Sequence, residues 1–348
     1  MTDRVRSSTD MKGTETTMRV QRWWIPLLLV IVPLLAACGS NGSADSAKSV
    51  SMVLDWYPWS NHSGLFMAQE KGYFKDQNLN VKINVPSSAD NVLQLVGTGH
   101  DTFGISYETD VLLAREQGVP VRSIAALVQQ PLNTVMTLKS SGITHPKQLE
   151  GKKVGYPGIP SDEALLATMM KADGGDSSSV QLVNVGFDLV PALISGRVDA
   201  IIGGYDVHES ILAEQQGYPV NVMHVQDWGV PNYYELVVVA SENTIKNDPT
   251  MVAQFVRAMT KGYTAAAADH KAALDSIVAK YPDTDTKMET IGMDRLAPLW
   301  TEGAPMFGWQ TTERWQQYAD WMTAHQLLKG PVDASAAFTN QFVADQQK

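Results

Sequence analysis

Short apolar segments alternate with amphipathic ones along most of this chain. Brief runs rich in Val, Ile and Leu predict strands, and stretches whose apolar positions recur at helical spacing predict helices. The predicted strands are 51–54, 81–85, 103–106, 122–128, 135–138, 153–156, 181–185, 200–203, 221–225 and 236–240. The predicted helices are 64–74, 90–97, 108–117, 161–173, 188–195, 207–216, 249–268, 270–280, 285–292 and 311–325. This alternation indicates parallel α/β units.

The order of segments repeats once along the chain. Segment 95–108 aligns with segment 193–206, and in each a strand ends in a tyrosine followed by an acidic residue. At nearly the same offset, the Tyr-Pro pair at 57–58 aligns with the one at 156–157, each after a strand and before a helix. Ligands of α/β proteins bind at the carboxyl ends of strands. Two similar lobes facing each other would therefore present matched rings and carboxylates to one cleft.

The part of the chain after the amino-terminal region is large for one hydrophobic core and suits two lobes. We expect the first lobe to comprise residues 49–139 and 241–348, and the second lobe to comprise residues 140–240. The crossings between lobes would then lie near 138–142 and 240–243. The second lobe becomes an insertion in the first, which is the organisation of a receptor that closes on its ligand by hinge motion.

The amino-terminal region has the pattern of a secretory signal that ends in a cysteine. Arg19 and Arg22 precede the uncharged segment 23–37, which is too short for a comfortable membrane span. The segment ends in Leu-Ala-Ala before Cys38, which resembles the bacterial lipobox. Residues 1–38 are therefore predicted to be a signal peptide with a lipobox, and Cys38 the site of lipid attachment. The alternative is an ordinary secretory signal with a chance cysteine.

The segment after this signal has no apolar content to pack. Residues 39–48 are rich in Gly, Ser, Asn and Ala and are predicted to be a flexible tether. Translation could begin at Met1, Met11 or Met18, because the residues before Met18 show no targeting pattern. The protein is expected outside the cytoplasm, attached to the bacterial cell membrane through its lipid anchor only.

Composition narrows the classes of partner and chemistry. The net charge of −10 argues against a nucleic-acid partner. Cys38 is the only cysteine, which excludes disulfides within the chain and thiolate metal sites. No P-loop, dinucleotide fingerprint or nucleophile elbow is present. We therefore expect no cofactor, no metal and no enzymatic activity, and we expect a monomer. The histidines without metal-ligand spacing, interpreted as surface or satisfied residues, are His100, His145, His208, His224, His270 and His325.

The loop after the first predicted strand is the richest candidate for ligand contact. Trp56 and Trp59 offer flat faces, and aromatic pairs contribute about 0.5–1.5 kcal/mol beyond area burial. A neutral His62 can donate one hydrogen bond and accept another, which suits a ring nitrogen. Asn61 could contact the ligand or cap the following helix. The competing interpretation is core packing for Trp56 and a surface lid for Trp59.

The aligned strand ends supply the second group of candidates. Tyr107 with Glu108 and Tyr205 with Asp206 occupy matching positions in the repeat. A carboxylate there could pair with an amine on the edge of a ligand, or it could cap the helix that follows. Glu235 precedes a buried strand and needs a partner, which a ligand amine would provide.

Ser161 is a weaker candidate at the start of a predicted helix. Glycine-containing loops at helix starts can bind anions. Asp162 and Glu163 already occupy the first turn, which makes a phosphate ligand less attractive. Ser161 is therefore interpreted first as a helix cap and second as a ligand contact.

Taken together, these segments resemble the thiamine-pyrimidine receptors of the periplasmic-binding-protein family. The family pattern is a strand, then Asp-Trp-x-Pro-Asn-x-x-His-x-Gly, then a helix that ends in Lys-Gly-Tyr-Phe. The matching segments of this chain are 55–58, 61–64, 71–74, 104–107, 117–120, 130–133, 196–200 and 233–236. The similarity extends from Val50 to Pro305, and the combination is specific although each segment alone is common.

The resemblance implies an α/β, two-lobed type II periplasmic-binding-protein fold with the ligand in the cleft. It also implies a receptor that delivers formylaminopyrimidine or hydroxymethylpyrimidine to an ABC permease for thiamine biosynthesis. Trp59 departs from the family, which has a small polar residue there. A similar branch binds riboflavin, so riboflavin, another small heteroaromatic or a sulfonate is the alternative ligand. A pyrimidine-processing enzyme is the second alternative, since related fungal proteins synthesise the pyrimidine with a cysteine-rich iron-binding cluster. This chain, with one cysteine, cannot build that cluster.

Overall fold

Strands and helices alternate through the described part of the chain, residues 47–88 and 91–345 of a computed structural model. The strands are β1 Lys48–Val53, β2 Leu79–Asn84, β3 Phe103–Ser106, β4 Val121–Ala126, β5 Asn133–Leu138, β6 Lys153–Tyr156, β7 Gln181–Asn184, β8 Ala200–Tyr205, β9 Val220–His224 and β10 Val237–Ser241. The α-helices are α1 Ser63–Glu70, α2 Tyr73–Asp76, α3 Val92–Gly97, α4 Glu108–Glu116, α5 Asp162–Ala172, α6 Leu189–Ile194, α7 Glu209–Gln215, α8 Glu242–Asn247, α9 Pro249–Ala268, α10 His270–Val278, α11 Thr286–Leu296, α12 Thr312–Ala324 and α13 Gln341–Ala344. Every predicted strand is present, whereas α8 and α13 were not predicted.

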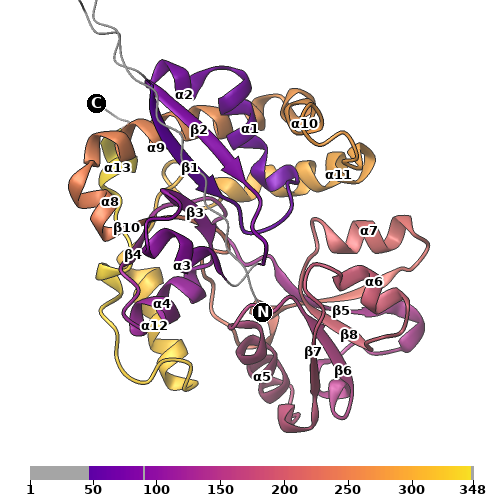
Figure 1. Cartoon of the computed structure of the whole chain (residues 1–348). Helices are drawn as coiled ribbons and strands as arrows, with labels where there is room; N and C mark the ends of the chain where they lie inside the picture. The colour runs from indigo at the N-terminus through magenta and orange to yellow at the C-terminus, as the bar shows by residue number, and fades with distance from the viewer. Residues whose placement is uncertain (1–46, 89–90, 346–348) are drawn as a thin grey trace, which may run out of the picture. The chain divides into compact units, whose positions relative to one another are not determined.

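The strands form two sheets with the same order. The first sheet is β2-β1-β3-β10-β4, and the second is β7-β6-β8-β5-β9. In each sheet one strand runs antiparallel to both of its neighbours, β10 in the first and β5 in the second. Figure 1 shows the two sets of strands as separate groups. The repeat found in the sequence is therefore a repeat of topology, and the predicted two-lobed α/β fold is confirmed.

The chain passes between the two sheets earlier than the sequence predicts, at 127–132 and again at 225–236. β5, predicted for the first lobe, pairs with β8 and β9 of the second sheet. β10, predicted for the second lobe, pairs with β3 and β4 of the first sheet. Both predicted crossings are therefore wrong by one strand. An apolar run identifies a buried strand but not the sheet that it joins. From here on, each lobe is defined by its sheet.

The helices after β10 return to the first lobe and pack against its sheet. α9 lies along α1, and a Cβ atom at Gly64 would lie only 2.3 Å from the ring of Tyr263. Phe255 of α9 stacks on Phe103 of β3, with ring centroids 4.0 Å apart. This packing fixes the helix that follows the loop after β1, and with it the position of that loop.

Aromatic packing also attaches the carboxyl-terminal helices to this lobe. Trp315 of α12 is fully buried and stacks on Phe338, with centroids 5.6 Å apart. Tyr318 stacks on Tyr233, with centroids 4.7 Å apart. α12 thereby supports the segment that leads into β10.

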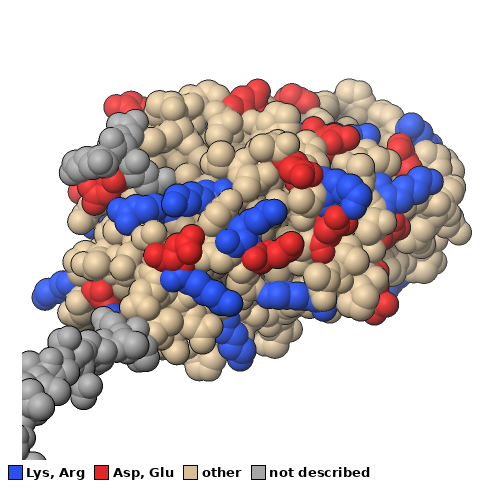
Figure 2. Space-filling model, turned by 90° about the horizontal axis from the view of Figure 1, so that it is seen from above, with Lys and Arg blue, Asp and Glu red and all other residues tan. Residues whose placement is uncertain are grey.

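The surface carries charges of both signs. On the face that Figure 2 shows, Lys and Arg side chains alternate with Asp and Glu, without a large field of one sign. Within the described ranges, no helix is both long and apolar enough to cross a membrane. The predicted signal peptide, Cys38 and most of the predicted tether lie outside the described residues.

Candidate functional site

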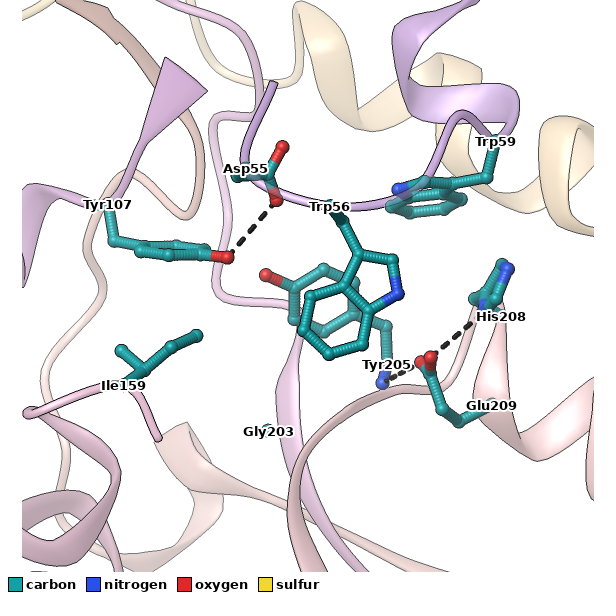
Figure 3. A pocket seen from close by; sticks show the side chains of 9 residues that line it. All are labelled: Asp55, Trp56, Trp59, Tyr107, Ile159, Gly203, Tyr205, His208 and Glu209. Carbon is teal, nitrogen blue, oxygen red and sulfur yellow. Dashed lines mark hydrogen bonds and ion pairs between the residues drawn. The ribbon is translucent and has the colours of Figure 1, made fainter. Parts of the chain in front are cut away.

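A small cavity lies between the lobes, at the carboxyl ends of β1, β3 and β8. The loop after β1 borders it from the first lobe, and the segment from β8 to α7 borders it from the second (Figure 3). We call it the front cavity, and it is lined by Asp55, Trp56, Trp59, Tyr107, Ile159, Gly203, Tyr205, His208 and Glu209. Strand ends from both sheets thus meet at one point, which is where α/β proteins bind ligands.

Asp55 organises the first-lobe side of the front cavity. This buried carboxylate lies 2.9 Å from His62 Nε2 through Oδ1, and its Oδ2 accepts a hydrogen bond from the Tyr107 hydroxyl at 3.1 Å. His62 Nδ1 accepts the backbone N–H of Trp59 at 3.3 Å, which leaves Nε2 to donate to Asp55. His62 is fully buried and does not line the cavity. Both of its nitrogens therefore shape the loop.

Asn61 attaches the same loop to the helices behind it. Its carbonyl oxygen accepts from the Tyr263 hydroxyl at 2.8 Å, and its Oδ1 accepts from the indole nitrogen of Trp300 at 3.4 Å. Asn61 is fully buried and does not line the front cavity. The geometry makes Asn61 and His62 supports of the loop and gives no backing to the ligand contacts predicted for them.

Tyr205 dominates the second-lobe side. Its backbone N–H donates to Glu209 Oε2 at 2.8 Å, and its hydroxyl donates to Glu235 Oε1 at 3.0 Å. Tyr107 and Tyr205, the pair identified by the sequence repeat, both line the front cavity. Burial, reinforced by nearby carboxylates, raises the pKa of both tyrosines well above the usual value. Both hydroxyls therefore keep their protons and act as donors.

His208 places a cation between the lobes. Its Nδ1 lies 2.9 Å from Glu209 Oε1, and its Nε2 lies 3.4 Å from Glu289 Oε1 on α11 of the first lobe. Burial lowers the pKa of His208, but Glu209 and Glu289 outweigh burial and raise it to about 10. Glu289 Oε2 also accepts the backbone N–H of Ser60 at 2.8 Å, and the His208 ring lies 4.9 Å from that of Trp59. The imidazolium thus ties α7 to the loop after β1.

Aromatic rings from the two lobes interlock beside the front cavity. Phe187, in the second lobe, meets Trp56 edge to face with centroids 4.3 Å apart. Phe187 also meets Tyr57, with centroids 4.6 Å apart. Trp56 and Trp59 both line the front cavity, as their predicted role requires (Figure 3). The ring of Trp59 lies 5.9 Å from that of Tyr205 in the second lobe.

A rear cavity lies on the other side of a shared wall. Tyr107, Ile159, Gly203 and Tyr205 line both cavities. The other lining residues of the rear cavity are Thr109, Asn133, Ser161, Asp162, Leu165, Tyr233 and Glu235. Two further predicted residues, Ser161 and Glu235, therefore lie at the site.

Glu235 is held by four hydrogen-bond donors. Its Oε2 accepts the backbone N–H groups of Leu132 and Asn133 at 2.7 and 3.1 Å and the Tyr233 hydroxyl at 3.0 Å. Its Oε1 accepts from Tyr205. Burial raises the pKa of Glu235 although these hydrogen bonds oppose it. In this arrangement both carboxyl oxygens of Glu235 already accept hydrogen bonds from the protein, and the residue forms part of the wall of the rear cavity.

Both cavities are contracted in this structure. The front cavity has a volume of about 20 Å³ and the rear cavity about 10 Å³. Each is close to the space that a single water molecule needs, whereas small-molecule pockets usually measure about 300 Å³ or more. A ring-sized ligand therefore enters only when the lobes part or the shared wall moves.

Two predicted site carboxylates lie elsewhere. Glu108 is fully buried, and its Oε2 accepts the backbone N–H of Tyr234 at 2.6 Å. Asp206 lies near the surface, where its carbonyl oxygen accepts from Arg295 at 3.1 Å. Neither residue lines either cavity. The sequence repeat identified two tyrosines that lie together at the site, but the acid after each tyrosine points elsewhere. Glu108 is the first residue of α4, and Asp206 lies in the turn before α7.

Several residues of the site were missed by the sequence analysis. Asp55 lines the front cavity but was not predicted to do so. Its place beside Trp56 in the segment that matches the family pattern could have identified it. His208 was interpreted as a surface or satisfied residue, although it and Glu209 closely follow Tyr205. Asp162 was considered only as an obstacle to phosphate. Within residues 47–88 and 91–345, no group of three or more His, Cys, Asp or Glu side chains could hold a metal ion.

Comparisons with known proteins place this site in a family. A family model described as "NMT1/THI5 like" matches residues 59–273. The chain is 36% identical over 322 residues to the formylaminopyrimidine-binding protein of Halalkalibacterium halodurans, covering 91% of this chain and 97% of that protein. It is 31% identical over 230 residues to the 4-amino-5-hydroxymethyl-2-methylpyrimidine phosphate synthase THI13 of Saccharomyces cerevisiae, covering 62% of this chain and 66% of that one.

Solved structures agree on the fold. The periplasmic aliphatic sulphonate binding protein SsuA of Escherichia coli superposes with a TM-score of 0.66 at 14% identity. The match covers 83% of this chain and 97% of SsuA. Similarity at this level of identity establishes the two-lobed periplasmic-binding-protein fold alone.

Proposed function

This chain belongs to the NMT1/THI5-like family, and we propose that it is the binding component of an ABC importer that captures a pyrimidine precursor of thiamine. The proposed ligand is formylaminopyrimidine or hydroxymethylpyrimidine, enclosed when the lobes close. The proposed partner is the ABC permease that recognises the closed form. The name of the relative from Halalkalibacterium halodurans supports this ligand class, since the match spans nearly all of both chains.

The observation that carries the proposal is the combination of groups around the two cavities. Trp56 and Trp59 supply flat apolar faces from one lobe, and Tyr205 supplies another from the second lobe. Buried carboxyl and hydroxyl groups, including those of Tyr107 and Glu235, lie beside these rings. A flat molecule with several hydrogen-bonding atoms on its edge matches both features.

A sulfonate or riboflavin is the alternative ligand within the same fold. Of the residues that line the two cavities, all within the described ranges, His208 alone becomes a cation, and it is already paired with Glu209 and Glu289. Asp55 and Glu209 line the front cavity, and Asp162 and Glu235 line the rear cavity. A permanently anionic sulfonate would lie against these acids without a free cation, which disfavours it. Riboflavin would need a wider opening of the cleft.

An enzyme that processes a pyrimidine is a different candidate, favoured by the match to the yeast synthase. Product formation from a pyrimidine precursor by the purified protein alone would support it. A ligand recovered unchanged after prolonged incubation would support the receptor.

The proposal includes a location outside the cytoplasm and a lipid on Cys38. Its basis is the sequence pattern of residues 1–38. Several acyl chains on one cysteine would hold a monomer at the membrane while leaving the lobes free to close.

Calorimetric titration of the ligand-free protein tests the ligand class. The panel comprises formylaminopyrimidine, hydroxymethylpyrimidine, thiamine, riboflavin and an alkanesulfonate. We expect binding of the two pyrimidines and a loss of ten-fold or more in Trp56→Ala, because the indole lines the front cavity. Tyr218→Ala, which truncates an exposed aromatic residue, is the matched control. Binding of the sulfonate alone, or equal affinities in both variants, would refute the proposed function or site.

A further inference from the structure

The rear cavity contains a buried carboxyl group with one unused oxygen. Asp162 is the first residue of α5 and is fully buried. Its Oδ1 accepts a hydrogen bond from Asn133 Nδ2 at 2.8 Å, whereas its Oδ2 has no hydrogen-bond partner. A Cβ atom at Gly203 would come within 3.3 Å of Oδ2, so the glycine keeps the space beside this oxygen open. Gly203 lines both cavities, and Oδ2 therefore faces the site.

The neighbours of Asp162 supply negative charge and no cation. Asp110 of α4 approaches from the first lobe and is bonded by the Ser161 side chain. Glu235 approaches from the segment before β10. The remaining polar groups that line the rear cavity are uncharged hydroxyls and an amide, those of Tyr107, Thr109, Asn133, Ser161, Tyr205 and Tyr233. A buried carboxylate without a cation is costly, so a carboxyl group in this position retains its proton.

The direction of the pKa shift agrees with this geometry. Burial, with smaller contributions from Asp110 and Glu235, raises the pKa of Asp162 to about 8 against the hydrogen bond from Asn133. The amino-terminal end of α5 favours the anion, but such dipole effects amount to at most about 1.5 pKa units, less than the shift caused by burial. The Oδ2 atom of Asp162 is consequently an O–H group at neutral pH.

The orientation of Asn133 fixes which oxygen carries the proton. Asn133 Oδ1 accepts the backbone N–H of Gly203 at 3.1 Å, so its Nδ2 must be the group that donates to Asp162 Oδ1. Oδ1 is thereby occupied as an acceptor. The proton remains on Oδ2, which points to the open side beside Gly203.

We propose that Asp162 determines ligand specificity: its free Oδ2 donates a hydrogen bond to an acceptor atom on the edge of a neutral heteroaromatic ring that enters the rear cavity. This inference rests on the proposed function and adds the chemical class of the ligand edge, a ring nitrogen or carbonyl oxygen without a negative charge. Phosphorylated or sulfonated analogues would lie against Glu235 in the rear cavity, with Asp110 close behind Asp162, and are excluded.

Asparagine at position 162 separates this role from that of an ionised carboxylate. In Asp162→Asn, the new amide oxygen would accept from Asn133 and its NH₂ group would donate into the cavity, as the protonated acid does. The variant should keep wild-type affinity and lose the pH dependence. Asp162→Leu keeps a similar volume without a donor and should bind at least ten-fold more weakly.

Calorimetric titration with formylaminopyrimidine, hydroxymethylpyrimidine and riboflavin, from about pH 6.5 to about pH 9.5, tests the proposal. We expect the affinity of the wild-type protein to fall by about ten-fold per pH unit once Asp162 ionises above about pH 8. Glu163→Gln changes the next, exposed residue of α5 and should reproduce the wild-type profile. Circular dichroism shows whether each variant folds. If a variant does not fold, the pH profile of the wild-type protein still tests the proposal.

The possible results distinguish the role of Asp162 from the proposed pyrimidine-binding function. Binding of a pyrimidine that strengthens with pH, or that Asp162→Asn weakens ten-fold, would overturn the role of Asp162 and leave the proposed function intact. Wild-type protein that binds riboflavin alone, with the expected pH profile, would overturn the pyrimidine and retain Asp162 as the donor. Wild-type protein that binds none of the three compounds would overturn both.

Discussion

Replacing Glu108 by glutamine should change how the stability of this protein depends on pH. Glu108 begins α4 and is fully buried, with Oε2 accepting the backbone N–H of Tyr234 at 2.6 Å. Its Oε1 has no hydrogen-bond partner. Burial raises the pKa of Glu108 from 4.5 to about 8, although the Tyr234 hydrogen bond and the charge of Arg314 oppose the shift. The folded protein therefore holds a proton that the unfolded chain has released at neutral pH.

The sign and size follow from this difference. A carboxyl group with a raised pKa contributes its full stability below the unfolded value of 4.5, and this is lost as pH rises through about 8. Between the unfolded pKa of 4.5 and pH 7, the wild-type protein loses about 1.4 kcal/mol of unfolding free energy per pH unit, which is roughly 3 kcal/mol in total. Glutamine does not titrate. The stability of Glu108→Gln relative to the wild-type protein should therefore increase by roughly 3 kcal/mol between pH 4.5 and pH 7.

Urea unfolding followed by circular dichroism at closely spaced pH values measures this difference. At pH 4.5 the variant should be equal to the wild-type protein or less stable, since its amide would have an unpaired N–H. Glu313→Gln is the control, because Glu313 is also in the first turn of a helix but is exposed. Parallel curves for Glu108→Gln and wild type would refute the reasoning. A large loss of ligand affinity in the variant would instead restore Glu108 as a ligand contact.

Three further predictions concern the lobes and the anchor. Tyr205→Phe removes one of the four donors to Glu235 and should lower the free energy of unfolding by about 1 kcal/mol in urea titration; an unchanged value would mean that this hydrogen bond contributes nothing. The bridge from His208 to Glu289 is fully present below the unfolded pKa of 6.5 and is lost as pH rises through about 10. Glu289→Gln should therefore lower ligand affinity at pH 7 and match wild type above pH 10, and equal affinity throughout would contradict the bridge. Cys38→Ser should move the protein from the membrane fraction to the soluble fraction, whereas unchanged membrane retention would exclude the lipid anchor.

The strands could be predicted because each is a short apolar run between turn residues. Val237–Ser241 and Asn133–Leu138 show where such prediction ends. Both were found as strands, but each was assigned to the wrong lobe. Parallel and antiparallel partners in a doubly covered sheet bury the same apolar side chains, so composition does not identify the partner. Only the observed hydrogen-bonded strand pairs show which lobe each of these two strands belongs to.

The candidate site shows the same limit for side chains. Trp56, Tyr107 and Tyr205 were predicted from strand ends and repeat positions, and these signals depend on topology alone. His62 was assigned to the ligand because of its chemistry, yet the structure pairs it with Asp55 seven residues earlier. Which face of a loop a ring occupies depends on its tertiary partners, which the sequence does not display.

Glu235 connects the rear cavity to the two segments, 127–132 and 225–236, in which the chain crosses between the lobes. The crossing segments of the chain are joined where Leu127 N–H and Val128 N–H donate to Leu236 carbonyl oxygen, at 2.7 and 3.2 Å. Adjacent to this junction, Glu235 accepts the backbone N–H of Leu132 in the other crossing segment and that of Asn133 at the start of β5. It also accepts the hydroxyl of Tyr205 from the second lobe.

One carboxyl group thus holds both crossing segments and one wall of the site. Tyr107 differs, because its hydroxyl is held by Asp55 within the same lobe and does not depend on the hinge. The two tyrosines that the repeat made equivalent are therefore mechanically unequal. If the lobes close as proposed, movement of the second-lobe wall would break or reform the hydrogen bond from Tyr205 to Glu235, whereas the hydrogen bond from Tyr107 to Asp55 lies within the first lobe. A ligand that displaces Tyr205 would consequently act on lobe closure directly, through one hydrogen bond.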